Sequence, residues 1–486
     1  MKLSPQHAGK IHFVGIGGIG MSGIAEILHS KGYHVTGSDI AENGNIDRLR
    51  AQNIRVSVPH NAGHVHDASV VVVSTAVKAD NPEVMEAANL SIPVVHRSEM
   101  LAELMRPHFA VSIAGTHGKT TTTSIGATML DHAGFDPIVV NGGIINAYGT
   151  NARLGQGDWF VAEADESDGS FLRLPRTIAV VTNIDPEHID HYGDFEAVKR
   201  AFYEFVVGIP YYGLGVLCYD HVNVRELAEQ LKHKRIVTYG FDERSDLQAV
   251  NLRVSPKGTH FDIKISDNFR RVCHKAPHFD HFEDLFLSMV GQHNVQNCLS
   301  VIAIAFEMGI NISTIKEALA NFQGVSRRFT EVGCFEEIKI IDDYAHHPEE
   351  IKAVLKTARD ICEKKVVAVF QPHRYSRFSD LFEEFCQCFS DADIVIAAPV
   401  YAAGEKPIEH LTQDYFKSAL AQYFNGQIIG LANPEELASL VYKTAEAGDY
   451  VVCLGAGNIS QWSRKLQSEL NAVRDTYKNK LVMVGS

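Results

Sequence analysis

The chain has 486 residues, of which 45% are hydrophobic and 21% charged, and its formal net charge is −14. This length is too great for one hydrophobic core and predicts about three domains, while the negative charge argues against a nucleic-acid-binding protein. Because no apolar run approaches the roughly 20 residues of a membrane span and residues 1–8 lack a signal-peptide pattern, we expect a cytoplasmic protein that does not insert into membranes.

The first segment, residues 1–107, begins with an apolar strand and a glycine-rich turn that contains Gly15, Gly17, Gly18 and Gly20. Glycines between a strand and a helix allow backbone N–H groups and the positive helix end to hold a diphosphate. Strand patterns then alternate with helical ones, which predicts βαβ units and a parallel sheet. Further strands are expected at residues 35–38, 54–58, 69–74 and 93–95.

Asp39 lies 24 residues after Gly15, at the end of the second expected strand. An acidic side chain at this place can bind a ribose hydroxyl. The glycine pattern and Asp39 together fit NAD, a UDP-sugar or another nucleotide diphosphate, and the alternative is a glycine turn that binds nothing.

The second segment, residues 108–324, opens with an apolar strand, the run Gly115-Thr116-His117-Gly118-Lys119-Thr120-Thr121 and a helical stretch. Glycines let backbone N–H groups curl around phosphate oxygens. Lys119 can reach the β- and γ-phosphates, and the Thr120 hydroxyl can bind Mg²⁺. The spacing from Gly115 to Gly118 is shorter than in the usual motif. We expect a nucleoside triphosphate site, and the alternative is an ordinary strand–turn–helix.

Polar side chains follow two further expected strands of this segment, at 159–163 and 177–182. The cluster from Glu163 to Asp168 can hold Mg²⁺ beside the phosphate loop, or it can be a solvated acidic loop. The cluster at 182–191 contains His188, a candidate metal ligand, although a single histidine is more often structural. Asparagines at the start of a helix expected at 293–308 can bind an adenine edge or cap that helix.

The third segment, residues 325–486, again alternates strands and helices, and we expect its last residues, about 476–486, to form a tail. Strands are expected at 339–341, 366–370, 394–397 and 450–454. Polar runs at 342–348 and 371–377 follow two of these strands, at the edge where open α/β sheets bind ligands. Arginines there suit a carboxylate, and the alternative is a set of surface Arg–Asp pairs.

Taken together, these motifs resemble those of the Mur ligases, the ATP-dependent amino-acid-adding enzymes of bacterial peptidoglycan synthesis. The resemblance covers essentially the whole chain, and the short phosphate loop is the family's own form. One departure is Ala345, where the family often has glycine. The matching segments are 15–20, 115–120, 163–168, 182–185, 291–294, 327–329, 342–348 and 370–377.

The resemblance implies three α/β domains: a Rossmann-like UDP-sugar domain (1–107), a phosphate-loop ATPase domain (108–324) and a Rossmann-like amino-acid domain (325–486). It assigns the UDP-sugar to Gly15, Gly17, Gly18, Gly20, Asp39 and Ser74. It assigns ATP to residues 115–121, His293, Asn294, Asn297, Arg327 and Asp342. It assigns one Mg²⁺, or Mn²⁺ in its place, to Thr120 and Glu163, and a second metal to His188. It assigns the amino acid to Tyr344, His346, Arg374 and Arg377, the last three acting with Lys119 in catalysis.

Within the family, the segments 370–377 and 400–405 point to an enzyme that joins L-alanine to UDP-N-acetylmuramate through an acyl-phosphate, as a monomer or homodimer. A ligase that attaches a ready-made tripeptide to the same sugar nucleotide remains open. More distant alternatives are a folate polyglutamate ligase, an NAD-dependent oxidoreductase built on residues 15–39, and a non-catalytic nucleotide switch.

Overall fold

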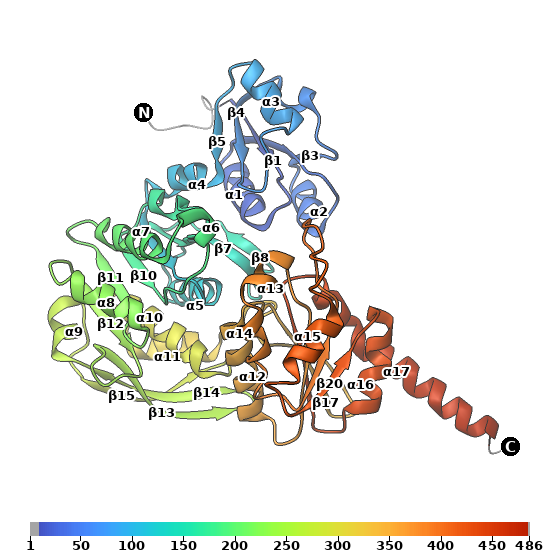
Figure 1. The fold of residues 1–486 in the computed structure, drawn as a ribbon. Helices are drawn as coiled ribbons and strands as arrows, with labels where there is room; N and C mark the ends of the chain where they lie inside the picture. The colour runs from blue at the N-terminus through green and yellow to red at the C-terminus, as the bar shows by residue number, and fades with distance from the viewer. Residues whose placement is uncertain (1–8, 485–486) are drawn as a thin grey trace. The chain divides into compact units, whose positions relative to one another are not determined.

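The computed structural model describes residues 9–484. The internal contacts divide the chain into two compact units. Of the described residues, the first unit comprises 9–252, 260–288 and 294–325, and the second comprises 253–259, 289–293 and 326–484. The described strands form three sheets, so the protein has the mixed α/β fold that the sequence predicts (Figure 1).

The first sheet is parallel and has the strand order β3-β2-β1-β4-β5. Its strands are β1 (Lys10–Val14), β2 (His34–Ser38), β3 (Arg55–Ser57), β4 (Ala68–Val73) and β5 (Val94–His96). The connecting helices are α1 (Ile19–Ser30), α2 (Gly44–Ala51), α3 (Pro82–Asn89) and α4 (Arg97–Met105), with the 3₁₀ turn η1 (Ala62–Val65). The order reverses at β1, which places the glycine-rich turn at the topological switch point of the sheet, where doubly wound folds bind nucleotides.

The second sheet has ten strands in the order β15-β14-β13-β12-β11-β10-β6-β9-β7-β8. Its strands are β6 (Phe109–Ala114), β7 (Ile138–Ile145), β8 (Thr150–Arg153), β9 (Trp159–Glu163), β10 (Ile178–Val181), β11 (Leu214–Cys218), β12 (Ile236–Gly240), β13 (Leu247–Ser255), β14 (Gly258–Ile265) and β15 (His281–Leu287). The strands from β7 to β12 in this order pair in parallel, so their carboxyl ends share one edge. The polar segments after β6, β9 and β10 therefore meet at that edge.

The helices that accompany the second sheet follow its strands in sequence. They are α5 (Lys119–His132), α6 (Ile189–Tyr192), α7 (Phe195–Val207), α8 (Val222–Gln230), α9 (Asp267–Val272), α10 (Gln292–Met308) and α11 (Ile312–Ala320), with the 3₁₀ turn η2 (Ser170–Arg173). The alternating apolar and polar residues at 237–265 predict an antiparallel excursion, and the structure differs from this prediction at the start of the segment. β12 pairs in parallel with β11, and β13 begins in parallel with β12, because alternation reports one exposed face rather than strand direction.

Within the first unit, the first sheet's helix α1 packs on the antiparallel pair β7–β8. Asn151 of β8 is fully buried there and donates from Nδ2 to the carbonyl of Ile19 at 2.5 Å. Arg48 of α2 donates to Asn151 Oδ1 at 3.1 Å. Gly23 of α1 permits this close approach, since a Cβ there would lie 2.9 Å from Asn151 Nδ2.

The third sheet lies in the second unit and has the order β16-β17-β21-β18-β19-β20, parallel except for β16. Its strands are β16 (Thr330–Phe335), β17 (Ile338–Asp343), β18 (Val366–Phe370), β19 (Ile394–Ala397), β20 (Gln427–Gly430) and β21 (Tyr450–Leu454). Alternate strand residues enter two separate cores. One core is covered by α12 (Pro348–Ile361), α13 (Tyr375–Asp380), α14 (Phe382–Cys386) and α15 (Gln413–Leu420), and the other by α16 (Leu437–Thr444) and α17 (Ile459–Val484).

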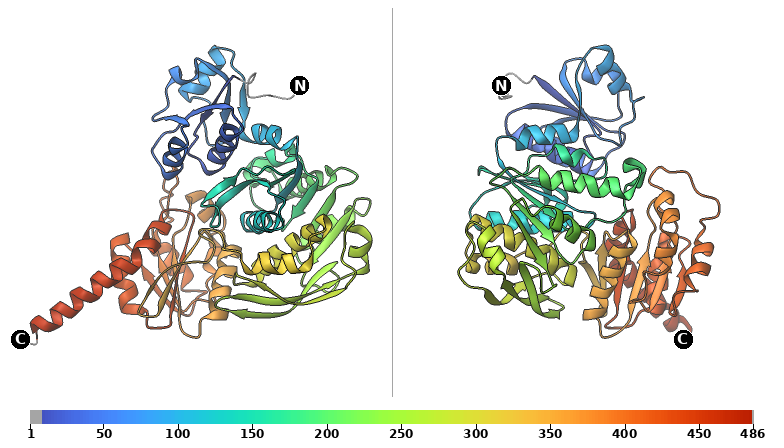
Figure 2. Two further views of the ribbon diagram at one scale, coloured as in Figure 1. Left: turned by 180° about the vertical axis from the view of Figure 1, so that it is seen from behind. Right: turned by 60° about the vertical axis from the view of Figure 1, so that its left-hand side comes forward.

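The expected tail at 476–486 is wrong for all its described residues, because α17 continues to Val484 and extends past the sheet (Figure 2). Residues 485–486 lie outside the described chain. Tyr477 of this stretch stacks on Tyr442 of α16 with ring centroids 5.4 Å apart. Between residues 9 and 484, none of the helices combines the length and the apolar character needed to cross a bilayer.

Candidate active site

The turn between β6 and α5 depends on two glycines with left-handed backbone. Gly118 caps α5 at φ +86°, and Gly115 has φ +136°. A Cβ on Gly118 would lie 2.5 Å from Asn297 Oδ1, and one on Gly115 would lie 2.0 Å from Thr182 Oγ1. The glycines thus allow side chains from α10 and from the end of β10 to approach the loop. The loop has no side-chain cap on α5, which leaves the helix N–H groups able to bind an anion.

Lys119 extends back over this loop toward the acidic segment that follows β9. Its Nζ donates to the carbonyls of Gly115 at 2.6 Å and Thr116 at 3.1 Å, and it lies 2.9 Å from Glu166 Oε2. Burial alone would lower the pKa of Lys119. The neighbouring carboxylates raise the pKa by more than burial lowers it, so the net pKa lies above its usual value and the ammonium stays charged. Burial raises the pKa of Glu166 to about 7, against the opposing effect of Lys119.

Thr120 and Glu163 lie together, as the sequence predicts. The Thr120 hydroxyl donates to Glu163 Oε2 at 3.0 Å, and the same oxygen accepts the backbone N–H of Gly142 at 2.8 Å. A hydroxyl beside a carboxylate is a donor set that Mg²⁺ prefers, so these residues fit a magnesium ion at the phosphate loop. Thr121, the next residue of α5, is buried.

The segment after β10 fastens the phosphate loop. Asn183 Oδ1 accepts the backbone N–H of His117 at 2.7 Å, and the Thr182 hydroxyl donates to the His117 carbonyl at 2.6 Å. The backbone N–H of Asp185 donates to the Thr116 hydroxyl at 2.9 Å. This network explains the polar cluster at 182–185 as support for the loop.

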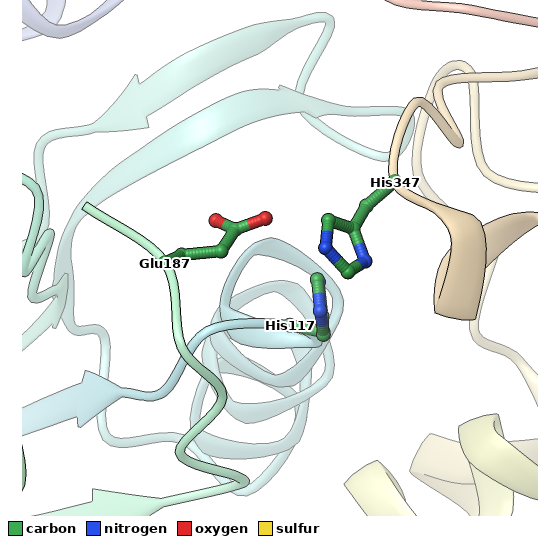
Figure 3. A group of neighbouring side chains, drawn as sticks. All are labelled: His117, Glu187 and His347. Carbon is green, nitrogen blue, oxygen red and sulfur yellow. The ribbon is translucent and has the colours of Figure 1, made fainter. Parts of the chain in front are cut away.

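The same segment carries two side chains that could bind a metal ion, Glu187 and His188. His188 has φ +59°, and its Nε2 lies 3.5 Å from Glu187 Oε2 and 4.0 Å from Glu166 Oε1. His188 therefore lies beside the acidic segment rather than isolated in a core. Figure 3 shows His117 in the turn before α5 and Glu187 on the loop after β10. The figure also draws His347, which caps α12 in the second unit.

The expected adenine-binding amides lie at the start of α10. Asn294 and Asn297 are both buried, and Asn297 is the residue that approaches Gly118. Sequence reasoning missed the adjacent Gln296, which donates to Asp220 at 2.6 Å, and His221, which lies 3.1 Å from Asp185. Asp220 and His221 follow β11, so the rule that ligands bind at strand carboxyl ends could have found both.

The glycine-rich turn after β1 is closed by Asp39. The backbone N–H of Gly17 donates to Asp39 Oδ2 at 2.8 Å, and Gly15 has φ +77°. Gly18 caps α1 without a side-chain partner, and Gly20 lies in the first turn of that helix. Ser74 is half-buried at the end of β4. The predicted sugar-nucleotide residues thus share one edge, with Asp39 bound to the loop itself.

Two side chains at the end of β5 were missed by the sequence reasoning. Arg97 donates from Nη2 to Asp165 Oδ2 at 3.0 Å, and a Cβ on Gly20 would lie 2.9 Å from Arg97 Nη1. His96 Nε2 lies 3.4 Å from Asp168 Oδ2. Because the strand at 93–95 was expected, the polar residues directly after it carried the same signal as those after the other strands.

In the second unit, Arg327 and Asp342 are engaged with the loop and helix that follow β21. Arg327 donates to the Gly455 carbonyl at 2.6 Å, and its guanidinium lies 4.7 Å from the ring centre of Tyr344. Asp342 is fully buried and accepts the Ser460 hydroxyl at 2.7 Å. Among residues 9–484, Asp342 Oδ1 and Arg327 Nε are buried without hydrogen-bond partners, which is a reason to expect a polar ligand there.

His293 also belongs to the second unit. Burial first, and the charge of Arg328 second, lower its pKa to about 4, against the effect of Glu350. The imidazole is therefore neutral at pH 7 and keeps one acceptor nitrogen.

The predicted amino-acid side chains gather at the carboxyl ends of β17 and β18. The rings of Tyr344, His346 and His373 follow one another at 5.0 and 6.1 Å. Arg374 donates to Glu405 Oε1 at 2.6 Å, which joins the segments 370–377 and 400–405 that the sequence singled out. Arg377 lies half-buried in α13.

Comparison with known proteins gives three family matches in sequence order. Residues 10–109 match the Mur ligase family catalytic domain, residues 113–305 the Mur ligase middle domain, and residues 327–457 the glutamate ligase domain of Mur ligases. The matches cover most of the chain and each of the three sheets.

Curated relatives and solved structures agree with these matches. The chain is 54% identical over 469 residues to the UDP-N-acetylmuramate–L-alanine ligase of Bradyrhizobium diazoefficiens, covering 96% of this chain and 99% of the relative. It is 54% identical over 473 residues to the enzyme of that name from Rhodospirillum centenum, covering 97% of each. The crystal structure of the UDP-N-acetylmuramate–alanine ligase of Thermotoga maritima superposes with a TM-score of 0.79 at 29% identity, covering 96% of this chain and 100% of that one.

Proposed function

The chain belongs to the Mur ligase family, and we propose that it joins L-alanine to the lactyl carboxylate of UDP-N-acetylmuramate, converting ATP to ADP and phosphate. The observation that carries this proposal is the charged Lys119 held over a glycine loop, with the next residue, Thr120, bonded to Glu163 at the end of β9. The names of relatives 54% identical to this chain support the choice of substrates.

The first step brings together two anions, the sugar's carboxylate and the triphosphate. A carboxylate oxygen attacks the γ-phosphorus, and the bond from this phosphorus to the β–γ bridging oxygen breaks. The products of this step are an acyl-phosphate and ADP. Lys119 and the N–H groups at the start of α5 reduce the repulsion and stabilise charge on the transferring group. Magnesium held by Thr120 and Glu163, with His188 for a second ion, would supply further positive charge.

In the second step the neutral amine of L-alanine attacks the acyl carbon. The tetrahedral intermediate then expels phosphate, and the nitrogen loses a proton. We assign the alanine carboxylate to Arg377 and Arg374, since an arginine can form two parallel hydrogen bonds to a carboxylate. We assign the orientation of the amine to His346, whose Nδ1 lies 2.9 Å from the Tyr344 carbonyl. Alignment of this kind can supply roughly 7–11 kcal/mol of a reaction's barrier.

The test is phosphate release from ATP with UDP-N-acetylmuramate and a panel of amines that includes L-alanine, glycine, L-serine and the recycled tripeptide. We expect release to require both the sugar nucleotide and an amine, with L-alanine the best. Preference for the tripeptide would replace the proposed function with the recycling reaction. Release that needs no amine would indicate a nucleotide switch.

A further inference from the structure

Arg97 connects two loops that the sequence treated separately. It is the first residue of α4, directly after β5, and so stands at the carboxyl edge of the first sheet. Its guanidinium lies between the first turn of α1, where the diphosphate-binding glycines are, and Asp165 in the acidic segment after β9. These residues all belong to the first unit.

The guanidinium has spare donors on the side that faces α1. Arg97 makes one hydrogen bond to the residues described between 9 and 484, from Nη2 to Asp165 Oδ2, whereas a guanidinium has five N–H donors. Nη1 is the atom beside Gly20. Asp165 is itself fixed, because its Oδ1 accepts the N–H of Ser167 at 3.1 Å.

The start of α1 also offers free N–H groups, although the carboxylate of Asp39 accepts the N–H of Gly17 just before the helix begins. Gly18 caps the helix with no side-chain hydrogen bond, and the first turn contains no acidic residue. A helix N-terminus has the equivalent of about half a positive charge, and a guanidinium beside it adds a full one. Asp165 offsets part of the guanidinium charge, and the N–H donors of the first turn and of Nη1 together favour an anion that both can bind.

We propose that Arg97 binds the diphosphate of the sugar nucleotide together with the first turn of α1, and that Asp165 holds the guanidinium in the orientation this requires. The inference rests on the proposed function for the identity of the ligand. It makes Arg97 a binding residue and Asp165 a positioning residue. It also gives Gly20 a second reason to be glycine, since a side chain there would displace Nη1.

The test is isothermal titration calorimetry without ATP, using two ligands. UDP-N-acetylmuramate has both the diphosphate and the lactyl carboxylate, and UDP-N-acetylglucosamine has the diphosphate alone. We expect Arg97→Ala to weaken both ligands about 10- to 100-fold, the range for a charge-assisted hydrogen bond. Arg97→Lys should recover part of the loss, and Arg106→Ala, an exposed arginine at the end of the same helix, should change neither affinity.

Asp165→Ala tests the positioning role. It should weaken both ligands several-fold when Arg97 is present and should add almost nothing in the Arg97→Ala background, a coupling that two independent structural defects would not produce. Additive effects would remove Asp165 from the proposal.

Three outcomes separate the possible failures. If Arg97→Ala binds both ligands as tightly as the unaltered protein, the inference about Arg97 is wrong and the proposed function stands. If it weakens UDP-N-acetylmuramate alone, Arg97 contacts the carboxylate and the diphosphate assignment is wrong. If the unaltered protein binds neither ligand, the proposed function is wrong, and the inference about Arg97 is wrong with it.

Discussion

Lys119 and Glu166 form a largely buried ion pair, with Nζ 2.9 Å from Oε2 and 3.0 Å from Oε1. The pair orients the lysine over its own loop, toward the carbonyls of Gly115 and Thr116. A single substitution in this pair also destabilises the fold. Removing one partner leaves the other charge buried and uncompensated, which typically lowers the free energy of unfolding by about 3–5 kcal/mol. Tests of the lysine must therefore separate lost chemistry from lost stability.

Replacing Lys119 with methionine together with Glu166→Gln removes both charges and keeps similar side-chain volumes. We expect alanine-dependent ADP release to fall by at least about 10²-fold, since the phosphoryl group loses a preorganised cation, while the melting temperature stays closer to that of the unaltered protein than in Lys119→Met alone. Lys199→Ala is the control, because Lys199 of α7 pairs with Glu196 of the same helix and Glu226 of α8, outside the site. Near-normal turnover in the folded double variant would refute the role of Lys119.

Thr120→Val removes the hydroxyl that donates to Glu163 and keeps the shape of the side chain. We expect turnover to fall and the Mg²⁺ concentration for half-maximal ADP release to rise, and Thr120→Ser should restore both. Thr123→Val is the matched control in the same helix, since the buried Thr123 hydroxyl has no hydrogen-bond partner among the described residues. An unchanged magnesium requirement in Thr120→Val would remove this hydroxyl from the metal site.

The regular parts of the fold were predictable because buried parallel strands are short, continuous apolar runs. The expected strands at 159–163, 366–370, 394–397 and 450–454 coincide with β9, β18, β19 and β21, and the helix expected at 293–308 corresponds to α10. The pair β7–β8 was missed, because residues 138–153 contain glycines and asparagines that are typical of turns. Their burial comes from packing against α1, which no local pattern reports.

The site was predictable where its residues directly follow the carboxyl end of a strand. That rule located the phosphate loop, the Glu163 cluster and the segment after β10. It did not give the partners, because these contacts join residues far apart in the chain: Glu163 with Thr120, Asn183 with His117, and Arg97 with Asp165. Asp39 was expected to face a ribose, and the structure bonds it to the N–H of Gly17, a contact that only the folded loop creates.

Arg377→Ala tests the amino-acid assignment. We expect the KM for L-alanine to rise at least about 10-fold, the effect of losing a charge-assisted hydrogen bond to a carboxylate, with the KM for ATP changed much less. Steady-state kinetics with each substrate varied at saturating levels of the others measures both. Equal increases in the two KM values would remove Arg377 from the alanine site.

His293 predicts how stability depends on pH. Its pKa is about 4 in the folded protein, against about 6.5 in the unfolded chain. As the pH falls below 6.5, the unfolded state takes up the proton first, so the free energy of unfolding decreases until the pH reaches about 4, by roughly 3 kcal/mol in total. Urea unfolding of the protein without nucleotide, repeated from pH 8 to pH 4.5, should show this decline.

His293→Gln removes the titrating group, so its stability should decline less over the same range. The difference in the free energy of unfolding between the variant and the unaltered protein should be constant above pH 7, where the imidazole is neutral in both the folded and the unfolded protein. As the pH falls, this difference should shift in favour of the variant. His373, whose pKa is also lowered to about 4 mainly by burial, remains in the variant and leaves part of the decline in place. Parallel curves down to pH 4.5 would mean that His293 is accessible to protons in the folded protein, and would contradict the buried, neutral imidazole described here.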